Sequence, residues 1–299
     1  MMISNQDCHR KTHMGFLSSE IGYPAQDTCL FHIIPAGYEM TVSYGTGTKH
    51  GPCAIIEASQ QLELFDGTSI PAENGIYTHP PLQFSNNDEQ NLLLIEKTIV
   101  SVINKNKIPV LLGGEHTVSV GAFQALSKLN DNIGIVQFDA HADLRDSYDG
   151  NRFSHACVMK RAIDMGFPIA QFGVRSLSFE EHMFRKELNI FHIDAKKLAE
   201  TISIEQVLPA DFPEKIYITF DLDCFDPSVI SATGTPVPGG LTWYQTIDLL
   251  DRISKQRTII GFDMVELAPI TGNHAADFSA ASLVYTIMGM AGFTRFNNL

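Results

Sequence analysis

In the stretch NIGIVQFDAHAD (residues 132–143), an apolar run passes directly into Asp139, His141 and Asp143. In an extended chain, residues two apart point the same way, so these three side chains gather on one side of a strand end. Two carboxylates and an imidazole packed together need hydrogen-bond partners or a positive charge between them. A metal ion would supply that charge.

Short β-branched runs of the same kind recur along the chain, and they are apolar on both faces rather than alternating. This pattern is typical of parallel strands covered by helices. The further runs occupy residues 28–37, 108–116, 168–176, 188–194, 215–226 and 257–267. Helical spacing is found at residues 52–65, 86–105, 242–255 and 277–290. The alternation predicts an α/β fold with a mainly parallel sheet. We expect a single domain over residues 1–299, with the first fifty residues as an edge or an oligomer arm.

The bulk composition excludes several classes of partner. With 21 Lys and Arg against 34 Asp and Glu, the net charge of −13 argues against nucleic acid and anionic membranes and is compatible with a small cationic substrate. No apolar run approaches the roughly 18 residues of a membrane helix, and no signal peptide is evident. The five cysteines are scattered and form no C-x-x-C pair. We therefore expect a cytoplasmic protein.

Four of the predicted strands end in acids or histidines. In an open parallel sheet, ligands bind beyond the carboxyl ends of the strands, so these side chains should meet at one rim. Four aspartates would be neutralised by two divalent cations, with two aspartates bridging the pair. The carboxylate and imidazole donors favour Mn²⁺, although affinity order alone would favour Zn²⁺ or Co²⁺. The residues at the rim are His116, Asp139, His141, Asp143, Asp221, Asp223 and Glu266.

Several motifs, in order, resemble the signatures of the ureohydrolases, the arginase and agmatinase family. They are GGEHT (113–117), FDAHADLRD (138–146), SHACVMKR (154–161), TFDLDCFDPSVISATGTPVPGGL (219–241) and GFDMVELAP (261–269). Residues 41–66 also resemble the N-terminal part of bacterial and archaeal agmatinases. The resemblance implies a three-layer α/β/α sandwich around a mainly parallel sheet, an arginase-like fold. It also implies a homo-oligomer, either a trimer or a hexamer.

The resemblance further implies two Mn²⁺ ions per chain and a ligand set for each. One ion would be held by His116, Asp139, Asp143 and Asp221, and the other by Asp139, His141, Asp221 and Asp223. A hydroxide bridging the ions would attack the guanidinium carbon of the substrate.

Three residues are expected to act on the substrate. Glu266 would anchor the guanidinium, since a carboxylate matches two parallel N–H groups. Asp143 would stabilise the tetrahedral intermediate and carry the proton to the departing amine. His155 would bind near the substrate and shuttle protons at the site mouth; the alternative is a surface histidine at a helix start. Thr235 is expected to support a metal ligand from behind.

The substrate depends on Arg145, which stands where arginases carry a small polar residue. The arginase pattern is therefore broken. Arg145 is either a loop arginine paired with Asp146 or a neighbouring subunit, or a clamp for a substrate carboxylate. The second role would favour 4-guanidinobutyrate or formiminoglutamate. The N-terminal resemblance favours agmatine, cleaved to urea and putrescine for polyamine biosynthesis.

Two other interpretations deserve comparison. Metallophosphoesterases also place D-x-H at a strand end and use a later G-N-H, and this chain has DAH at 139–141 and TGNHA at 271–275. It has no Gly-Asp dipeptide, so the middle motif of that class is missing. A non-catalytic metal-binding protein on the same fold would normally have lost a ligand or Glu266, and all are present.

Overall fold

A single parallel sheet organises the chain. The computed structural model describes residues 14–129, 131–200 and 207–297. Within these residues eight strands pair in the order β2-β1-β3-β8-β7-β4-β5-β6, and every pair is parallel. The strands are β1 Phe31–Ala36, β2 Ile76–Thr78, β3 Ile108–Gly113, β4 Ile133–Phe138, β5 Ile169–Phe172, β6 Phe191–Ile193, β7 Lys215–Asp221 and β8 Thr258–Val265. The predicted α/β fold is confirmed.

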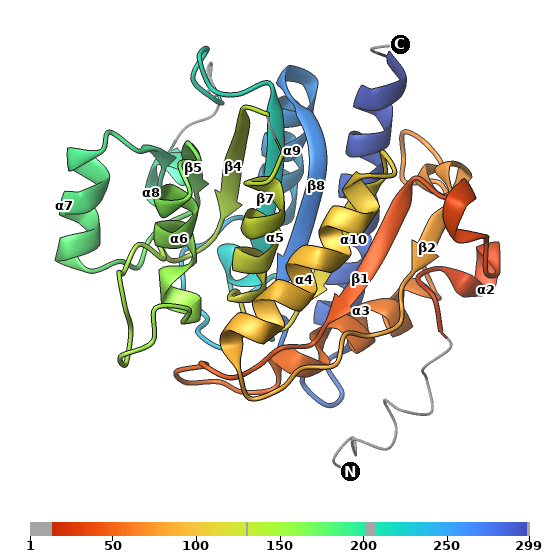
Figure 1. The fold of residues 1–299 in the computed structure, drawn as a ribbon, viewed down its shortest axis with the longest axis horizontal. Helices are drawn as coiled ribbons and strands as arrows, with labels where there is room; N and C mark the ends of the chain where they lie inside the picture. Colours follow the sequence, from red (N-terminus) through yellow and green to blue (C-terminus); the bar gives the residue numbers. More distant parts are fainter. Residues whose placement is uncertain (1–13, 130, 201–206, 298–299) are drawn as a thin grey trace.

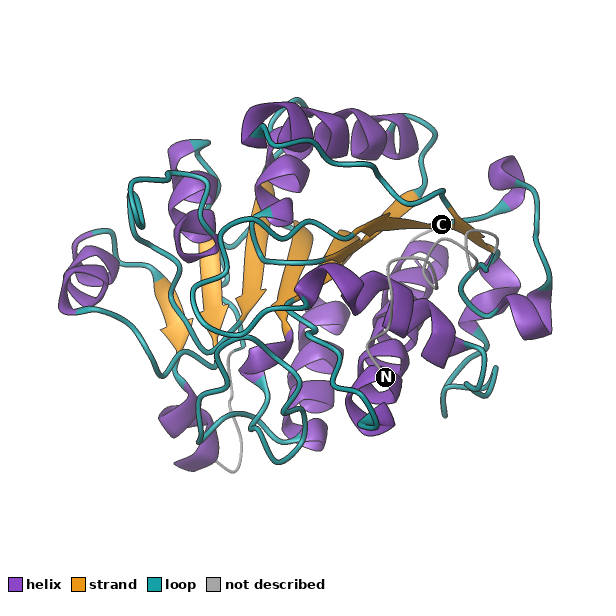
Figure 2. Cartoon of the chain, turned by 90° about the horizontal axis from the view of Figure 1, so that it is seen from below, coloured by secondary structure: helices purple, strands orange, loops and turns teal. Residues whose placement is uncertain are grey.

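Helices cover both faces of the sheet and make a three-layer sandwich (Figures 1 and 2). One face carries α4 Asp88–Ile103, α5 Val118–Leu126, α6 Val158–Asp164 and α7 Phe179–Glu187. The other carries α3 Gly51–Ser59, α8 Ala195–Glu200, α9 Trp243–Gln256 and α10 His274–Asn297. Shorter elements are α2 Ser18–Ile21, η1 Gln26–Thr28, η2 Thr48–His50, η3 Pro71–Asn74, η4 His155–Cys157 and η5 Leu222–Cys224.

The core lies in two layers, one on each side of the sheet. Successive strand residues enter opposite layers: Ile33 and Ile218 pack toward α3, α9 and α10, whereas Ile34 and Tyr217 pack toward α4 and α5. This arrangement explains why the strands read as continuous apolar runs, since both faces are buried under helices. No helix of the described chain is long and apolar enough to cross a membrane.

The predicted strands and helices occur, with shifted ends. All seven predicted strand runs contain a strand, and the three-residue edge strand β2 was not predicted because it is too short to show a pattern. Helix α9 begins with a capping box formed by Thr242 and Gln245, and Asn87 caps α4 by accepting from the N–H of Gln90. Helix α3 ends at Ser59, earlier than expected.

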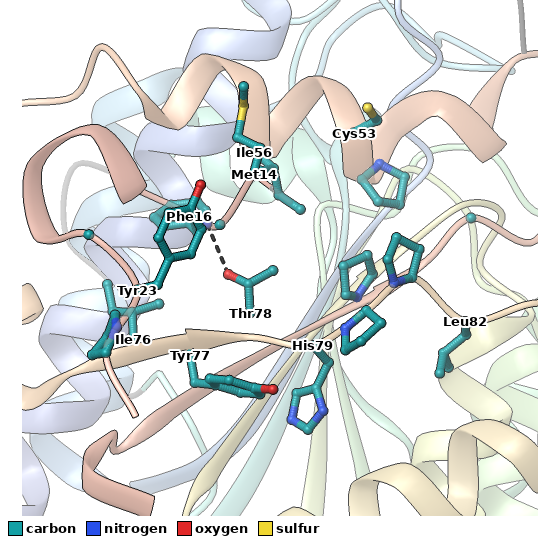
Figure 3. A pocket seen from close by; sticks show the side chains of 18 of the residues that line it. Met14, Phe16, Tyr23, Cys53, Ile56, Ile76, Tyr77, Thr78, His79 and Leu82 are labelled. Atoms are coloured by element: carbon teal, nitrogen blue, oxygen red, sulfur yellow. Dashed lines mark hydrogen bonds between the residues drawn. The ribbon is translucent and has the colours of Figure 1, made fainter. Parts of the chain in front are cut away.

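The prediction for the first fifty residues is wrong in part. Strand β1 lies inside the sheet between β2 and β3, so Phe31–Ala36 is neither an edge nor an arm. Residues 1–13 lie outside the described residues. Residues 14–24, α3 and β2 border a hollow of about 410 Å³, lined by apolar and aromatic side chains such as Phe16 and Tyr77 (Figure 3). This hollow contains none of the predicted site residues.

Candidate metal centre

The carboxyl ends of four adjacent central strands bring the predicted rim residues together. Strands β3, β8, β7 and β4 are neighbours in the sheet, and the short segments that follow them carry the ionisable side chains. His116 follows β3, Asp139, His141 and Asp143 follow β4, Asp221 and Asp223 come from β7 and η5, and Glu266 follows β8. Residues more than 100 positions apart in the chain therefore share one site.

One group of buried donors surrounds His116. Donor atoms of His116, Asp139 and Asp221 all lie within 4.8 Å of one another, a spacing at which they could hold a metal ion. His116 Nδ1 is 3.2 Å from Asp139 Oδ2, 2.9 Å from Asp143 Oδ2 and 3.6 Å from Asp221 Oδ2. Asp143 therefore faces the same ring nitrogen as the other two carboxylates.

A second group shares Asp139 with the first. Donor atoms of Asp139, His141 and Asp223 also lie within 4.8 Å of one another. His141 Nδ1 is 3.1 Å from Asp223 Oδ2 and 3.5 Å from Asp139 Oδ1. Asp139 thus presents one oxygen to each group, as expected of a bridging carboxylate. Bridging by Asp221 stays a prediction.

Hydrogen bonds hold these carboxylates in place. Asp139 accepts from His141 N at 2.6 Å and from Gln137 Nε2 at 2.7 Å. Asp221 Oδ1 accepts from Asp223 N at 2.8 Å, and Asp223 Oδ1 accepts from Ala140 N at 3.0 Å. Hydrogen bonds from protein groups therefore orient each of these three carboxylates.

Thr235 lies where it was expected, beside a carboxylate of the second group. Its Oγ1 donates to Asp223 Oδ2 at 3.4 Å. The hydroxyl therefore contacts the same oxygen of Asp223 that faces His141.

The electrostatics of the cluster call for added positive charge. Burial, reinforced by the charge of Asp139, raises the pKa of Asp143 to about 7. Burial and the charge of Asp223 raise the pKa of Asp221 well above its usual range. Burial opposes protonation of His141, but its neighbours Asp139 and Asp223 outweigh burial and raise the pKa of this imidazole to about 11. Asp143, Asp221 and His141 thus retain protons that divalent cations would replace.

The side chains fit the metal pair that the motifs imply. His116 Nδ1 is buried and has no hydrogen-bond partner, although Asp143 Oδ2 lies only 2.9 Å away. An orphaned ring nitrogen among three carboxylates is costly unless a cation fills the space between them. Four carboxylates and two imidazoles, without a thiolate, are donors suited to Mn²⁺.

Two of the residues expected to act on the substrate have left-handed backbones. Asp143 has φ 51° and Glu266 has φ 67°. Residues other than glycine adopt this backbone conformation only at a cost in free energy. Glu266 Oε1 accepts from His116 N at 2.7 Å, which ties the strand ends of β8 and β3 together. Burial, followed by the charge of Glu115, raises the pKa of Glu266 well above its usual range. A cation beside Glu266 would relieve that cost.

His155 begins η4 and is partly buried. Its Nδ1 lies 3.2 Å from Thr41 Oγ1, its Nε2 lies 3.5 Å from Ser43 Oγ, and its ring packs edge-on to Tyr148. Burial, and then the charge of His116, lower the pKa of His155. The ring therefore favours the neutral form, which can accept a proton.

Glu115 and Thr41 complete the site, and neither was singled out from the sequence. Glu115 is fully buried; its carboxylate accepts from Met40 N at 2.8 Å, Thr41 N at 2.7 Å and Thr41 Oγ1 at 2.7 Å. A Cβ on the neighbouring Gly114 would lie 2.0 Å from Tyr38 O, so only glycine lets this loop approach β3. The sequence feature that could have indicated Glu115 is its place after two glycines in GGEHT. Its partner Thr41 lies far away in the sequence and carries no such mark.

Of the two partners expected for Arg145, Asp146 is wrong, and a neighbouring subunit stays a prediction. Arg145 Nη2 lies 3.8 Å from Glu181 Oε2, whereas Asp146 pairs with Arg161 at 2.6 Å and Arg152 at 3.4 Å. The loop role of Arg145 is therefore compatible with the structure, but through α7 and not through its chain neighbour.

The chain is similar to proteins of one family over most of its length. The sequence profile of the arginase family matches residues 30–289. An N(1)-aminopropylagmatine ureohydrolase of Synechocystis sp. is 36% identical over 93% of this chain and 94% of its own. An agmatinase of Pyrococcus horikoshii is 34% identical over 87% of this chain and 91% of its own.

The fold is similar to that of a solved ureohydrolase structure. The crystal structure of agmatine ureohydrolase of Thermoplasma volcanium superposes with a TM-score of 0.85, at 27% identity, over 97% of this chain and 99% of that one. The metallophosphoesterase alternative is thereby excluded, and Asn273 of its G-N-H motif instead bonds Ser231 Oγ at 3.3 Å. The chain belongs to the arginase family of ureohydrolases.

Proposed function

We propose that this ureohydrolase cleaves agmatine to urea and putrescine at a pair of Mn²⁺ ions. The observation that carries the proposal is the pair of His/Asp groups that share Asp139 beside the buried carboxylate of Glu266. A hydrolase for linear amidines needs both parts, a metal pair for the water and an anion for the guanidinium. A homo-oligomer, trimer or hexamer, belongs to the same proposal.

The proposed ligands are those expected from the motifs. His116, Asp139, Asp143 and Asp221 would hold one ion, and Asp139, His141, Asp221 and Asp223 the other. When bound, the ions would activate a water molecule for attack at neutral pH. Substrate orientation and proton transfer would fall to Glu266, Asp143 and His155.

Glu266 would orient the substrate. A guanidinium is planar and positively charged, and a carboxylate can accept two of its parallel N–H bonds. The left-handed backbone and the bond from His116 N hold Glu266 in one position. Binding a cation would also offset the cost of burying this carboxylate next to Glu115.

Asp143 and His155 would handle protons. Asp143 Oδ2 lies against His116 Nδ1, so one carboxylate can serve the metal centre and receive the proton released as water attacks. His155, neutral and held between Thr41 and Ser43, would pass protons at Nε2 between the departing amine and solvent. Separate groups would thus take and give protons at the two ends of the reaction.

The choice of agmatine rests on Arg145. Agmatine ends in an ammonium group, and an arginine that faced the substrate would repel it. The guanidinium of Arg145 is instead occupied by Glu181 and lies over the ring of Tyr148. This engagement argues against a substrate carboxylate, and hence against 4-guanidinobutyrate and formiminoglutamate.

N(1)-aminopropylagmatine is the second candidate substrate. The relative from Synechocystis that carries that name is 36% identical to this chain. The longer compound retains the guanidinium that Glu266 would hold and differs only in its cationic tail. The chemistry proposed above is the same for both.

A urea-release assay tests the proposal. Purified protein loaded with Mn²⁺ would be given agmatine, N(1)-aminopropylagmatine, 4-guanidinobutyrate and arginine at matched concentrations. Agmatine should have the highest kcat/KM. A higher value for N(1)-aminopropylagmatine would transfer the proposal to the second candidate. Preference for 4-guanidinobutyrate would overturn both choices of substrate, and no urea from any of the four would overturn the proposed reaction.

A further inference from the structure

A row of buried polar side chains lies behind His116. Thr219 of β7 and Asp263 of β8 are direct cross-strand partners, and both are fully buried. Thr219 Oγ1 lies 2.8 Å from His116 Nε2 and 2.8 Å from Asp263 Oδ1, and Ser119 Oγ of α5 lies 3.2 Å from Thr219 Oγ1. Burying a carboxylate in the middle of a sheet is costly. Neither Thr219 nor Asp263 is a proposed ligand, so the row needs its own explanation.

The hydrogen bonds assign the protons along this row. Asp263 Oδ1 accepts the hydroxyl proton of Thr219 at 2.8 Å, because an ionised carboxylate has no proton to donate, whereas the more distant Ser119 hydroxyl can itself be the donor. The oxygen of Thr219 then has only lone pairs left for His116, so Nε2 of His116 must be the donor. The ring can bind a cation only in its neutral form, which keeps this proton on Nε2 and leaves the lone pair on Nδ1. That is the nitrogen that faces the carboxylates and has no hydrogen-bond partner.

We propose that Thr219 and Asp263 are positioning residues for the metal centre. They keep the proton of His116 on Nε2 and fix the plane of the ring, so that the Nδ1 lone pair is directed at the cation. Ligating histidines commonly depend on such a partner at the second nitrogen. The inference rests on the proposed metal centre, and it assigns a role to two residues outside the ligand set.

Metal affinity tests the inference without relying on turnover. Metal-free protein would be titrated with Mn²⁺, and the free ion counted by its paramagnetic resonance signal. Wild-type protein should bind two ions per chain. Thr219→Val keeps the branched shape but removes the hydroxyl, and it should weaken one of the two ions by about 10–100-fold. Thr219→Ser should restore the affinity, and Asp263→Asn should fall between Thr219→Val and the wild type.

Ser119→Ala is the matched control, because it removes a hydroxyl that touches Thr219 but not the one that bonds His116. It should bind both ions with wild-type affinity. Thermal unfolding of the chelated variants separates affinity from folding: a purely structural role would lower the unfolding temperature and leave both affinities unchanged. If Thr219→Val does not fold, Asp263→Asn carries the test.

The outcomes separate this inference from the proposed function. Two ions bound at wild-type affinity by Thr219→Val, or by Asp263→Asn if Thr219→Val does not fold, would overturn the positioning role alone. A wild-type protein that binds fewer than two ions would overturn the metal centre and the inference with it. A wild-type protein that binds two ions but releases no urea would overturn the proposed reaction, while the affinity ranking of the variants still supported the positioning role.

Discussion

Arg145 reaches across to α7, where its Nη2 atom lies 3.8 Å from Glu181 Oε2. Its guanidinium also lies 5.4 Å from the centre of the Tyr148 ring. The other oxygen of Glu181 accepts from Leu144 N at 3.0 Å, so this glutamate joins the loop after the metal cluster to the start of a helix. The arginine that distinguishes this chain from the arginase pattern is therefore part of a structural contact.

Replacing Arg145 should have little effect on agmatine turnover. Arg145→Ala removes a half-exposed ion pair, and such pairs contribute less than about 1 kcal/mol. The kcat/KM for agmatine should therefore change by well under tenfold, which corresponds to about 1.4 kcal/mol. Steady-state urea release measures this, with Arg145→Lys as the control that keeps the charge. A large loss, together with better turnover of 4-guanidinobutyrate, would assign Arg145 to the substrate.

Replacing the charge of Glu266 should separate catalysis from metal binding. Glu266→Gln keeps the shape and an oxygen that can accept from His116 N, but it loses the charge that faces the guanidinium. We expect kcat/KM to fall by at least about 100-fold, as when a key electrostatic group is removed from an active site. Metal content measured by mass spectrometry should stay at two ions per chain. Near-normal turnover by this variant would remove Glu266 from the proposed substrate site.

Loss of Asp221 should disturb both ions. Its carboxylate faces His116 Nδ1 at 3.6 Å and is hydrogen-bonded to Asp223 N, so it touches both groups of donors. Asp221→Ala should therefore bind fewer than two ions and lose activity that added Mn²⁺ does not restore. Asp131→Asn, which alters an exposed ion pair with Lys215, is the control. Two tightly bound ions in Asp221→Ala would contradict the bridging role.

The metal-free protein should lose stability as pH rises from 6.5 to 9. The pKa of Asp143 is raised to about 7 and that of His141 to about 11, so the folded state holds protons that the unfolded chain releases. Stability carried by such groups is present at lower pH and is lost as pH rises through their folded pKa values. The depressed pKa of His155 acts only below about 6.5, where its unfolded form becomes protonated.

Thermal unfolding with a chelator, repeated at several pH values, measures this dependence. Mn²⁺ should reverse it, because ions bind the deprotonated ligands and their stabilising effect grows with pH. A chelated protein that becomes more stable between pH 6.5 and 9 would contradict the assigned directions.

Removal of Glu115 should destabilise the loop that carries Thr41. Glu115→Ala leaves the donors Met40 N, Thr41 N and Thr41 Oγ1 without their acceptor, at a cost of about 1–3 kcal/mol. Urea denaturation of the chelated protein measures the loss in the free energy of unfolding. Glu115→Gln, which keeps an accepting oxygen, should lose less. Equal stability in all three proteins would show that the loop is held by other contacts.

The sheet and the cluster could be predicted because both leave local patterns in the sequence. Apolar runs mark strands buried on two faces, and the ionisable residues Asp139, His141 and Asp143 directly after such a run indicate a cluster at the strand end. The parallel arrangement then brings the strand ends to one rim. The edge strand β2 and the early end of α3 could not be predicted, because tertiary contacts decide such boundaries.

Contacts between segments that lie far apart in the sequence could not be predicted either. Glu115 binds a loop some 74 residues earlier in the chain, and Arg145 binds a helix 36 residues later. Neither partner is marked by spacing or residue type. Only the fold shows that a glutamate of GGEHT serves the loop and that Asp146 is already paired with Arg161.

The position of β8 has a consequence for how the protein is made. This strand comes last in the chain but lies between β3 and β7, and it alone joins β2-β1-β3 to β7-β4-β5-β6. Until β8 has been synthesised, the two parts of the sheet have open edges that face each other, and His116 remains apart from Asp139 and Asp221. Long-range parallel pairing of this kind forms late and exposes strand edges meanwhile. We therefore expect the donors around His116 to come together only once β8 has paired with both parts, whereas Asp139, His141 and Asp223 come from segments that follow the neighbouring strands β4 and β7.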